Sequence, residues 1–340
     1  MIEPTKKDIK MIQGLCVMAM VCLHLFDTRE YQTLFKPLAF FMGVPLIFYF
    51  AQLSDFCVMG FAFCSGYAHF RLFNNGNYYF GRLKSLLKIL IKYWLVLIVF
   101  TGISIAIGKK GFMPGTIGAF IQNAFVFGSS YNGAWWYLFV YIVIVLVSPL
   151  IIQFIKRAPF FLILLVNATL YTVSYYYRFW FPLTGVLSSR LGPLGMTVVE
   201  YMMGVAAAKL GYFSRVHSMS AKFTSPIRII LSVFLIITMM MIRTLVVPSL
   251  FVAPISGLVI ITVFQLWKKP KYMETLFLWV GSHSTYIWLT HMFFYMNPFS
   301  GLVYKAEYPL CIFALMMAIT ILTSKILNFI ENQFYSMVGL

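Results

Sequence analysis

Two histidines lie inside long apolar stretches of this 340-residue sequence, where they are the groups best suited to chemistry. His24 lies near the end of the run IQGLCVMAMVCLHLF, and His291 lies in GSHSTYIWLTHMFF. Ionisable side chains in such segments are costly to bury and usually face a cavity or a partner. Neutral imidazole is a competent general base, so the two histidines could divide proton removal and substrate orientation between them. An interfacial hydrogen bond for His24 and plain packing for His291 are the alternatives.

Other polar residues could take part in the same chemistry. Tyr286 and Thr290 share one face of the helix expected around the second histidine. Glu200, in TVVEYMMG, is an acid near the middle of an apolar stretch, where a carboxyl is either protonated or paired. It could orient a histidine, bind substrate, relay protons or make only a structural hydrogen bond. Asp55 opens another apolar run, at a depth that could meet the first histidine.

A group of basic residues precedes another apolar stretch. Arg82, Lys84, Lys88 and Lys92 lie close together, and the three lysines repeat every four residues along one helix face. They could hold the phosphates of an anionic nucleotide. Lysines that snorkel to the membrane surface explain the same pattern.

Several other chemistries find no support in the sequence. Neither intramembrane histidine has a metal-ligand partner at helical spacing, which argues against a zinc site. The five cysteines lie in apolar runs without a CxxC pair, as packed thiols do. No P-loop, HExxH or GxSxG motif is present.

Composition identifies the environment in which these residues work. Apolar residues make up 61% of the chain and charged residues 10%, whereas soluble domains carry about 25% charged residues. The net charge of +17 comes from short basic runs between apolar segments, which is the pattern of cytoplasmic loops and not of a nucleic-acid-binding protein. With no polar linker in the sequence, we expect a single integral membrane domain over residues 1–340 and no separate soluble domain.

The expected fold class is all-α, a polytopic membrane helix bundle of about ten transmembrane helices. A spanning helix needs ~20 mostly apolar residues. The stretches that qualify are about 9–26, 54–70, 88–107, 135–153, 159–177, 191–209, 228–244, 249–267, 275–297 and 308–329. An eleventh run, 38–53, contains Gly43 and Pro45 and could span, re-enter or lie in the interface. The aromatic run 131–141 is typical of an interfacial belt, with a sugar-stacking platform as the alternative.

The positions of the two histidines favour ten spans over eleven. With ten spans and the N-terminus inside, 18 of the 26 Lys and Arg residues lie on the cytoplasmic side, which alone does not decide the question. Each histidine then lies 15 residues along its helix, ~22 Å from the cytoplasmic entry at 1.5 Å per residue. Both would share one level, which the eleven-span arrangement does not allow. We therefore expect both termini in the cytoplasm.

Five short motifs follow one another in the order of a known family. Gly14 precedes His24 by ten residues, the second predicted span contains FAFCSGY at 61–67, and GRLKSLLK at 81–88 enters the third. A span with Trp135, Trp136 and Tyr137 comes next, and Gly281 to His291 approximates G-x-x-S-x-x-I-Y-L-x-H.

In these motifs the chain resembles the membrane-bound acyltransferase family 3, whose members acylate sugars of surface glycans and lipids. It departs from the family at Gln13, where an arginine or lysine is usual; Lys10 lies near the same helix face. The resemblance implies a multi-pass protein of the cell membrane that transfers acetyl from acetyl-CoA to a hydroxyl of a surface or lipid-linked glycan, without a metal.

The resemblance also suggests roles for individual residues. Arg82, Lys84 and Lys88 would hold the nucleotide, His24 would be the general base, and His291 or Tyr286 would orient the acyl group or stabilise the oxyanion. Expected partners are membrane lipids, the acyl-CoA donor and the glycan acceptor, with a homodimer left open. The alternatives are a transporter or flippase, which should show internal repeats, a glycan polymerase with a large outer loop, and a membrane domain for an amino-acid-handling enzyme.

Overall fold

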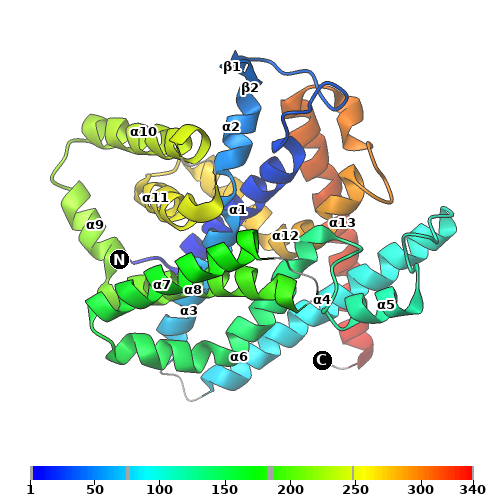
Figure 1. Ribbon diagram of the computed structural model, residues 1–340, viewed down its shortest axis with the longest axis horizontal. Helices are drawn as coiled ribbons and strands as arrows, with labels where there is room; N and C mark the ends of the chain where they lie inside the picture. The colour runs from blue at the N-terminus through cyan, green and yellow to red at the C-terminus, as the bar shows by residue number, and fades with distance from the viewer. Residues whose placement is uncertain (1–2, 74–76, 182–184, 186, 247–248, 339–340) are drawn as a thin grey trace. The chain divides into compact units, whose positions relative to one another are not determined.

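The structure, a computed structural model, describes residues 3–73, 77–181, 185, 187–246 and 249–338, and these residues are mainly helical (Figure 1). The all-α fold class is therefore confirmed. The extreme ends of the predicted domain, 1–2 and 339–340, lie outside the described residues. The helices are α1 (Lys6–Phe26), α2 (Leu46–Leu53), α3 (Phe56–Leu72), α4 (Tyr78–Ala106), α5 (Ile117–Ala124), α6 (Trp136–Arg157), α7 (Phe160–Trp180), α8 (Ser188–Leu210), α9 (Tyr212–Ser220), α10 (Ser225–Met241), α11 (Ala253–Leu266), α12 (Lys271–Tyr295) and α13 (Pro309–Val338).

Short elements join some of these helices. They are the two-stranded pair β1 (Phe40–Phe41) and β2 (Val44–Pro45), the 3-10 turns η1 (Gly133–Trp135), η3 (Leu250–Val252) and η4 (Val303–Ala306), and a π-helical turn η2 (Ile242–Val246).

Eight helical segments of the described chain are long and apolar enough to cross a membrane. Two of the ten predicted spans are not among the eight: the stretch Leu250–Leu266 is a shorter apolar helix, and α12 is long but carries the polar residues around His291. A chain that crosses lipid must satisfy its backbone hydrogen bonds internally, which helices do.

The run 38–53 does not form a span of its own. Its first part is an antiparallel hairpin with a tight turn at Met42 and Gly43, both with positive φ. Positive φ at two central residues is the geometry of a type I′ turn, which glycine favours. Its second part, α2, joins α3 in one candidate span, Leu46–Leu72. The eleven-span arrangement therefore has no support in the structure.

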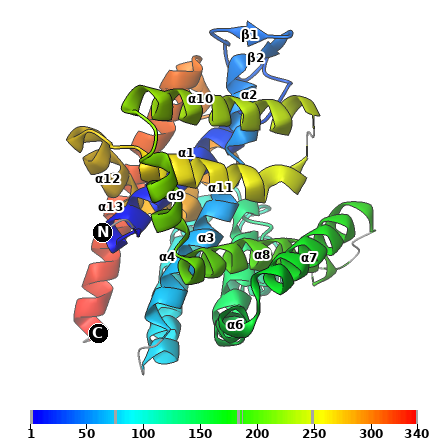
Figure 2. The same cartoon turned by 90° about the vertical axis from the view of Figure 1, so that its left-hand side faces the viewer.

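Two compact units make up the chain. The first comprises Met1–Leu23, Phe48–Tyr78 and Leu146–Ser282, and the second comprises His24–Ile47, Tyr79–Val145 and His283–Leu340. Within the first unit α3 packs along α8 (Figure 2). A Cβ added at Gly66 would collide with the Tyr201 carbonyl oxygen, so the close approach of these two backbones requires glycine.

Glu3, which precedes α1, is held within the first unit. Its Oε1 accepts hydrogen bonds from the Ser214 backbone N–H at 3.0 Å and the Ser214 hydroxyl at 2.5 Å. Its Oε2 accepts one from the Tyr67 hydroxyl. Burial alone would raise the pKa of Glu3, but the hydrogen bonds from Ser214 and Tyr67 outweigh burial and hold this pKa below its ordinary value.

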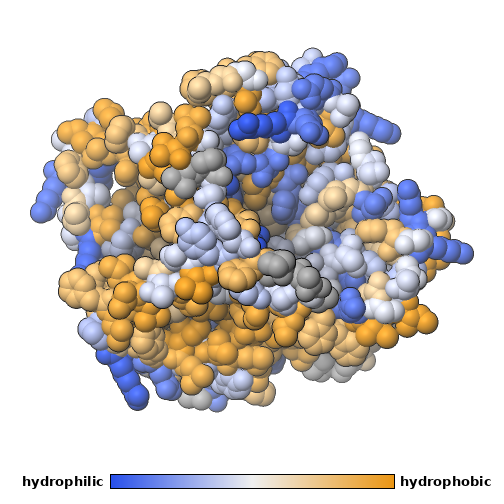
Figure 3. Space-filling model, in the orientation of Figure 1, coloured by the Kyte–Doolittle hydropathy of each residue, from blue (hydrophilic) through white to orange (hydrophobic). Residues whose placement is uncertain are grey.

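The outer surface of the helices is apolar, as a lipid-facing surface must be. Apolar residues cover much of the lower part of the face in Figure 3, over α6 and α7. Leu150 and Phe161 are 70% and 80% exposed, and no described residue of α10 is buried within the protein. Exposed large apolar side chains over whole helices are expected when lipid, and not water, surrounds them.

Candidate active site

The structure brings His24 and His291 together in the second unit. His24 Nδ1 lies 2.7 Å from His291 Nε2, which is hydrogen-bond distance. The two rings are nearly parallel, with 11° between their planes and centroids 4.9 Å apart. A short N···N contact with that centroid separation means that the rings meet edge to edge, nearly coplanar, and do not stack face to face.

The backbone of α12 determines which ring nitrogens carry protons. His291 Nδ1 lies 2.9 Å from the Trp288 carbonyl oxygen and 3.2 Å from that of Ile287. A carbonyl oxygen can only accept, so we assign the proton of neutral His291 to Nδ1 and the lone pair to Nε2. His24 Nδ1 must then donate to His291, which leaves the lone pair of His24 on Nε2. The neutral pair thus presents a single basic nitrogen.

Burial separates the two histidines further. The side chain of His291 is 0% exposed, whereas His24 is only partly buried. Of the two, only His24 has exposed surface, while His291 is fully buried and hydrogen-bonded to its own helix and to the first ring. His24 is therefore suited to proton transfer and His291 to holding it in position.

Glycines let the two histidine-bearing helices approach closely. In the first unit a Cβ on Gly14 of α1 would collide with the Phe277 carbonyl oxygen of α12, and one on Gly281 would collide with that of Lys10. Each glycine precedes its histidine by ten residues. The Gly14 motif of the sequence therefore has a packing reason, because only glycine allows this backbone contact.

The segment 132–135 fixes α12 next to His291. The Asn132 side-chain amide and the Trp135 indole N–H both donate to the Leu289 carbonyl oxygen at 3.0 Å. In return the Trp288 indole N–H donates to the Ala134 carbonyl oxygen, also at 3.0 Å. Trp135 is 1% exposed. The interfacial-belt interpretation is therefore wrong for Trp135, which is a buried support of the helix that carries the second histidine.

Tyr286 belongs to a buried ionic cluster in the second unit. Its hydroxyl donates to Glu331 Oε2 at 2.9 Å, and Lys92 forms an ion pair with the same oxygen. The Lys92 ammonium also lies 4.4 Å from the centroid of the Tyr286 ring. Glu331 is 5% exposed, so Lys92 and Tyr286, and not water, compensate for the burial of its carboxylate. The Thr290 hydroxyl bonds back to the Tyr286 carbonyl oxygen at 2.7 Å.

The cluster continues along α13 through residues that sequence reasoning missed. Lys92 Nζ lies 3.4 Å from Asn328 Oδ1, and the Asn328 amide donates to the Ser324 hydroxyl oxygen at 3.2 Å. That hydroxyl lies 2.8 Å from His283 Nδ1. Ser324, Asn328 and Glu331 are spaced by four and three residues, so they share one face of the helix. This spacing was the signal that could have revealed them.

Glu200 and Asp55 lie in the first unit and have charged partners there. Asp55 Oδ2 accepts from Arg243 Nε at 2.5 Å, and both side chains are 5% exposed. Glu200 is 4% exposed and interacts electrostatically with Asp55 and Arg178. Arg243 stands on the π-helical turn η2, a type of turn that is frequent at functional sites. The structure pairs Asp55 with Arg243, a partner that sequence reasoning missed.

The three basic residues expected to bind a nucleotide lie on α4 in the second unit. Lys84 and Lys88 are exposed, and neither forms an ion pair with another described residue. Arg82 is partly buried, and within the described ranges its Nε has no hydrogen-bond partner. Lys92 is already paired with Glu331. In residues 3–73, 77–181, 185, 187–246 and 249–338 there is no group of three side chains that could hold a metal.

Comparison with known proteins gives the family. A family model described as an acyltransferase domain matches residues 6–328, from the start of α1 to within α13. No curated protein and no solved structure gives a significant match. The matched region includes both histidines, Tyr286 and the basic residues of α4. With this domain and the apolar helices above, the chain is a multi-pass membrane acyltransferase that belongs to acyltransferase family 3.

Proposed function

We propose that this acyltransferase is an O-acetyltransferase that moves acetyl from acetyl-CoA to a hydroxyl of a surface or lipid-linked glycan of the cell envelope. The observation that carries the proposal is the His24–His291 pair, which leaves one basic nitrogen free on the partly exposed His24 inside an acyltransferase domain. A hydroxyl acceptor is the substrate that needs such a base, because its proton must leave as its oxygen attacks.

The proposed step conserves atoms and charge with His24 alone as proton carrier. His24 Nε2 removes the proton of the acceptor hydroxyl as its oxygen bonds to the thioester carbonyl carbon. The carbon–sulfur bond then breaks, and the departing CoA thiolate takes this proton from the imidazolium, which returns His24 to its neutral form. During the cycle the Nδ1–H of His24 stays hydrogen-bonded to His291, which helps to stabilise the transient positive charge.

His291 and Tyr286 have different supporting roles in this proposal. His291 orients His24 through a hydrogen bond that its own Nδ1–H···O=C contact fixes. The Tyr286 hydroxyl points to Glu331, so it could donate to an oxyanion only by giving up that bond. We therefore assign Tyr286, with Glu331 and Lys92, to positioning α12, and orientation of the base to His291. Asp55, which is paired with Arg243, and Glu200 lie in the first unit, and the proposed step uses neither.

The donor would bind through the basic residues of α4. The exposed ammonium groups of Lys84 and Lys88 and the buried, unbonded Nε of Arg82 provide donors for phosphate oxygens of the CoA nucleotide. All three lie in the same unit as the histidine pair. In this proposal the start of their helix faces the cytoplasm, where acetyl-CoA is made, and both termini of the cell-membrane protein lie on that side, as an excess of basic residues there favours.

The proposal is tested by mass spectrometry of surface glycans from cells with the gene, without it, and with His24→Ala. Loss of a substituent with the mass of acetyl in the last two strains is expected. Membrane insertion of His24→Ala is checked by fractionation. Gly102→Ala, on α4 with open space at its Cβ position, is the control variant and is treated in the same way. Unchanged glycans in the deletion strain, or full acetylation by inserted His24→Ala, would contradict the proposal. Loss of glycan export with normal acetylation would indicate a flippase.

A further inference from the structure

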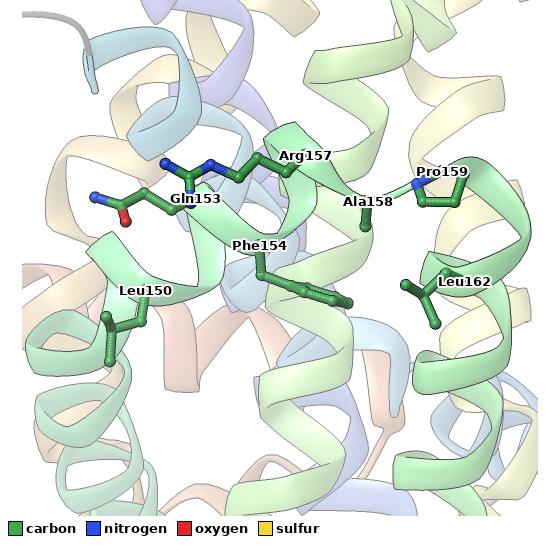
Figure 4. A pocket seen from close by; sticks show the side chains of 7 residues that line it. All are labelled: Leu150, Gln153, Phe154, Arg157, Ala158, Pro159 and Leu162. Atoms are coloured by element: carbon green, nitrogen blue, oxygen red, sulfur yellow. The ribbon is translucent and has the colours of Figure 1, made fainter.

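A groove in the first unit lies between the end of α6 and the start of α7. It has a volume of about 450 Å³, and its walls include Leu150, Gln153, Phe154, Arg157 and Leu162 (Figure 4). It is formed by residues that the acyl-transfer proposal does not use.

The groove has an apolar wall and a polar edge. Phe154 points from α6 towards Leu162 of α7, and the two side chains face each other across the groove (Figure 4). Leu150 extends the apolar wall and is 70% exposed. Gln153 and Arg157 are four residues apart, so they project from one face of α6. A ligand that fills the groove must therefore be amphipathic.

The charge at the polar edge is positive and uncompensated. Arg157 is exposed, and it forms neither an ion pair nor a hydrogen bond with the rest of the described chain. Lys209 donates to the Ile155 and Ala158 carbonyl oxygens at 2.7 Å, so the negative end of α6 already has its own cation. None of the lining residues is acidic. The groove therefore favours an anion over a zwitterion.

The position of the groove relative to the spans indicates the source of that anion. One candidate span, Gly133–Arg157, ends at the arginine, and the next, Phe160–Trp180, begins three residues later. The connection between them must lie where the chain leaves and re-enters the hydrocarbon, which is the level of the lipid headgroups. Basic pockets between helices at this level bind anionic lipid headgroups.

We propose that this groove binds an anionic phospholipid, with its phosphate on Arg157 and Gln153 and an acyl chain along Leu150, Phe154 and Leu162. A planar guanidinium can hold two phosphate oxygens at once. The apolar wall sets the lipid apart from free phosphate, which would contact the polar edge alone. The proposal is independent of the acyl-transfer reaction, because none of these residues belongs to the candidate active site.

The test uses the full-length chain in detergent, titrated with phosphatidylglycerol, phosphatidylcholine or inorganic phosphate. Bound lipid is counted by native mass spectrometry, and the thermal unfolding midpoint is followed in parallel. Phosphatidylglycerol should be retained and should raise the midpoint, whereas the other two should not. Since one basic residue near an anionic lipid contributes ~1 kcal/mol, Arg157→Gln should weaken phosphatidylglycerol binding about fivefold.

Two further variants make the test decisive. Arg228→Gln removes an exposed arginine near the end of another candidate span of the same unit and should leave lipid binding unchanged. Leu162→Ala should weaken lipid binding about threefold through lost apolar contact. Equal effects of Arg157→Gln and Arg228→Gln would show general charge attraction and overturn the proposal. Equal stabilisation by phosphatidylcholine would also overturn it, and a response to inorganic phosphate that matches the lipid would identify a phosphate site instead.

Discussion

The histidine pair predicts a specific non-additivity in a double-mutant cycle. If His24 is the general base of the proposed transfer, His24→Ala should lower the rate of acetyl transfer by about 10²–10⁴, or ~3–5 kcal/mol. His291→Ala removes one buried hydrogen bond to the imidazolium that forms at His24. Hydrogen bonds to charged groups contribute ~1.5–3 kcal/mol, so this variant alone should lose about 10- to 150-fold.

The double variant separates a supporting role from an independent one. If His291 acts only through His24, then His24→Ala/His291→Ala should be no slower than His24→Ala, within about threefold, because the group being oriented is already gone. His291→Asn should recover part of the rate, since an amide oxygen can accept from His24 Nδ1–H. The assay is the initial rate of labelled acetyl transfer from acetyl-CoA in isolated membranes, normalised to the amount of inserted protein. Multiplicative losses in the double variant would refute the supporting role of His291.

Three further predictions concern stability, each measured as an unfolding midpoint in detergent. Lys92→Met should cost ~3 kcal/mol because it leaves the buried Glu331 carboxylate without its cation, and Lys92→Met/Glu331→Met should recover most of that loss; an additive double variant would contradict the pairing. Gly14→Ala should lower the midpoint strongly through its collision with the facing carbonyl, whereas Gly102→Ala, with open space, should not; equal effects would refute the close approach. Because the pKa of Glu3 is lowered on folding, its stabilisation is complete above the unfolded value and is lost as pH falls through the folded one. Wild type should therefore lose more stability than Glu3→Gln below about pH 4.5, and parallel acid profiles would contradict this.

The sequence indicated the histidine pair because ionisable groups in apolar helices are rare and costly. Equal spacing from the helix entries placed His24 and His291 at one level, and the structure puts their rings in hydrogen-bond contact. The hydrogen bonds that assign their protons could not be predicted, since they depend on the rotation of α12 about its axis. That rotation comes from tertiary contacts such as the two donors on the Leu289 carbonyl oxygen.

Long-range ion pairs were the main features that sequence reasoning missed. Asp55 and Arg243 are 188 residues apart, and Lys92 and Glu331 are 239 apart. No local pattern links partners at such distances. Each charged side chain alone indicated that a partner exists, because an unpaired charge in an apolar stretch is unfavourable. Trp135 was misjudged because aromatic residues near a span end are usually interfacial. Its buried indole N–H finds a carbonyl acceptor inside the protein, which satisfies it without the interface.

Because His291 donates to a carbonyl oxygen, no proton can pass through the histidine pair and beyond it. The hydrogen bonds run from His24 through His291 to the Trp288 oxygen, an atom that cannot take up a proton and pass it on. A proton that enters at His24 Nε2 must leave by the same nitrogen. In the proposed step the pair can therefore hold one proton from the acceptor hydroxyl and give it to the departing thiolate, but it cannot conduct protons across the membrane. An acyltransferase built this way would not leak the ion gradient of its membrane through these two histidines.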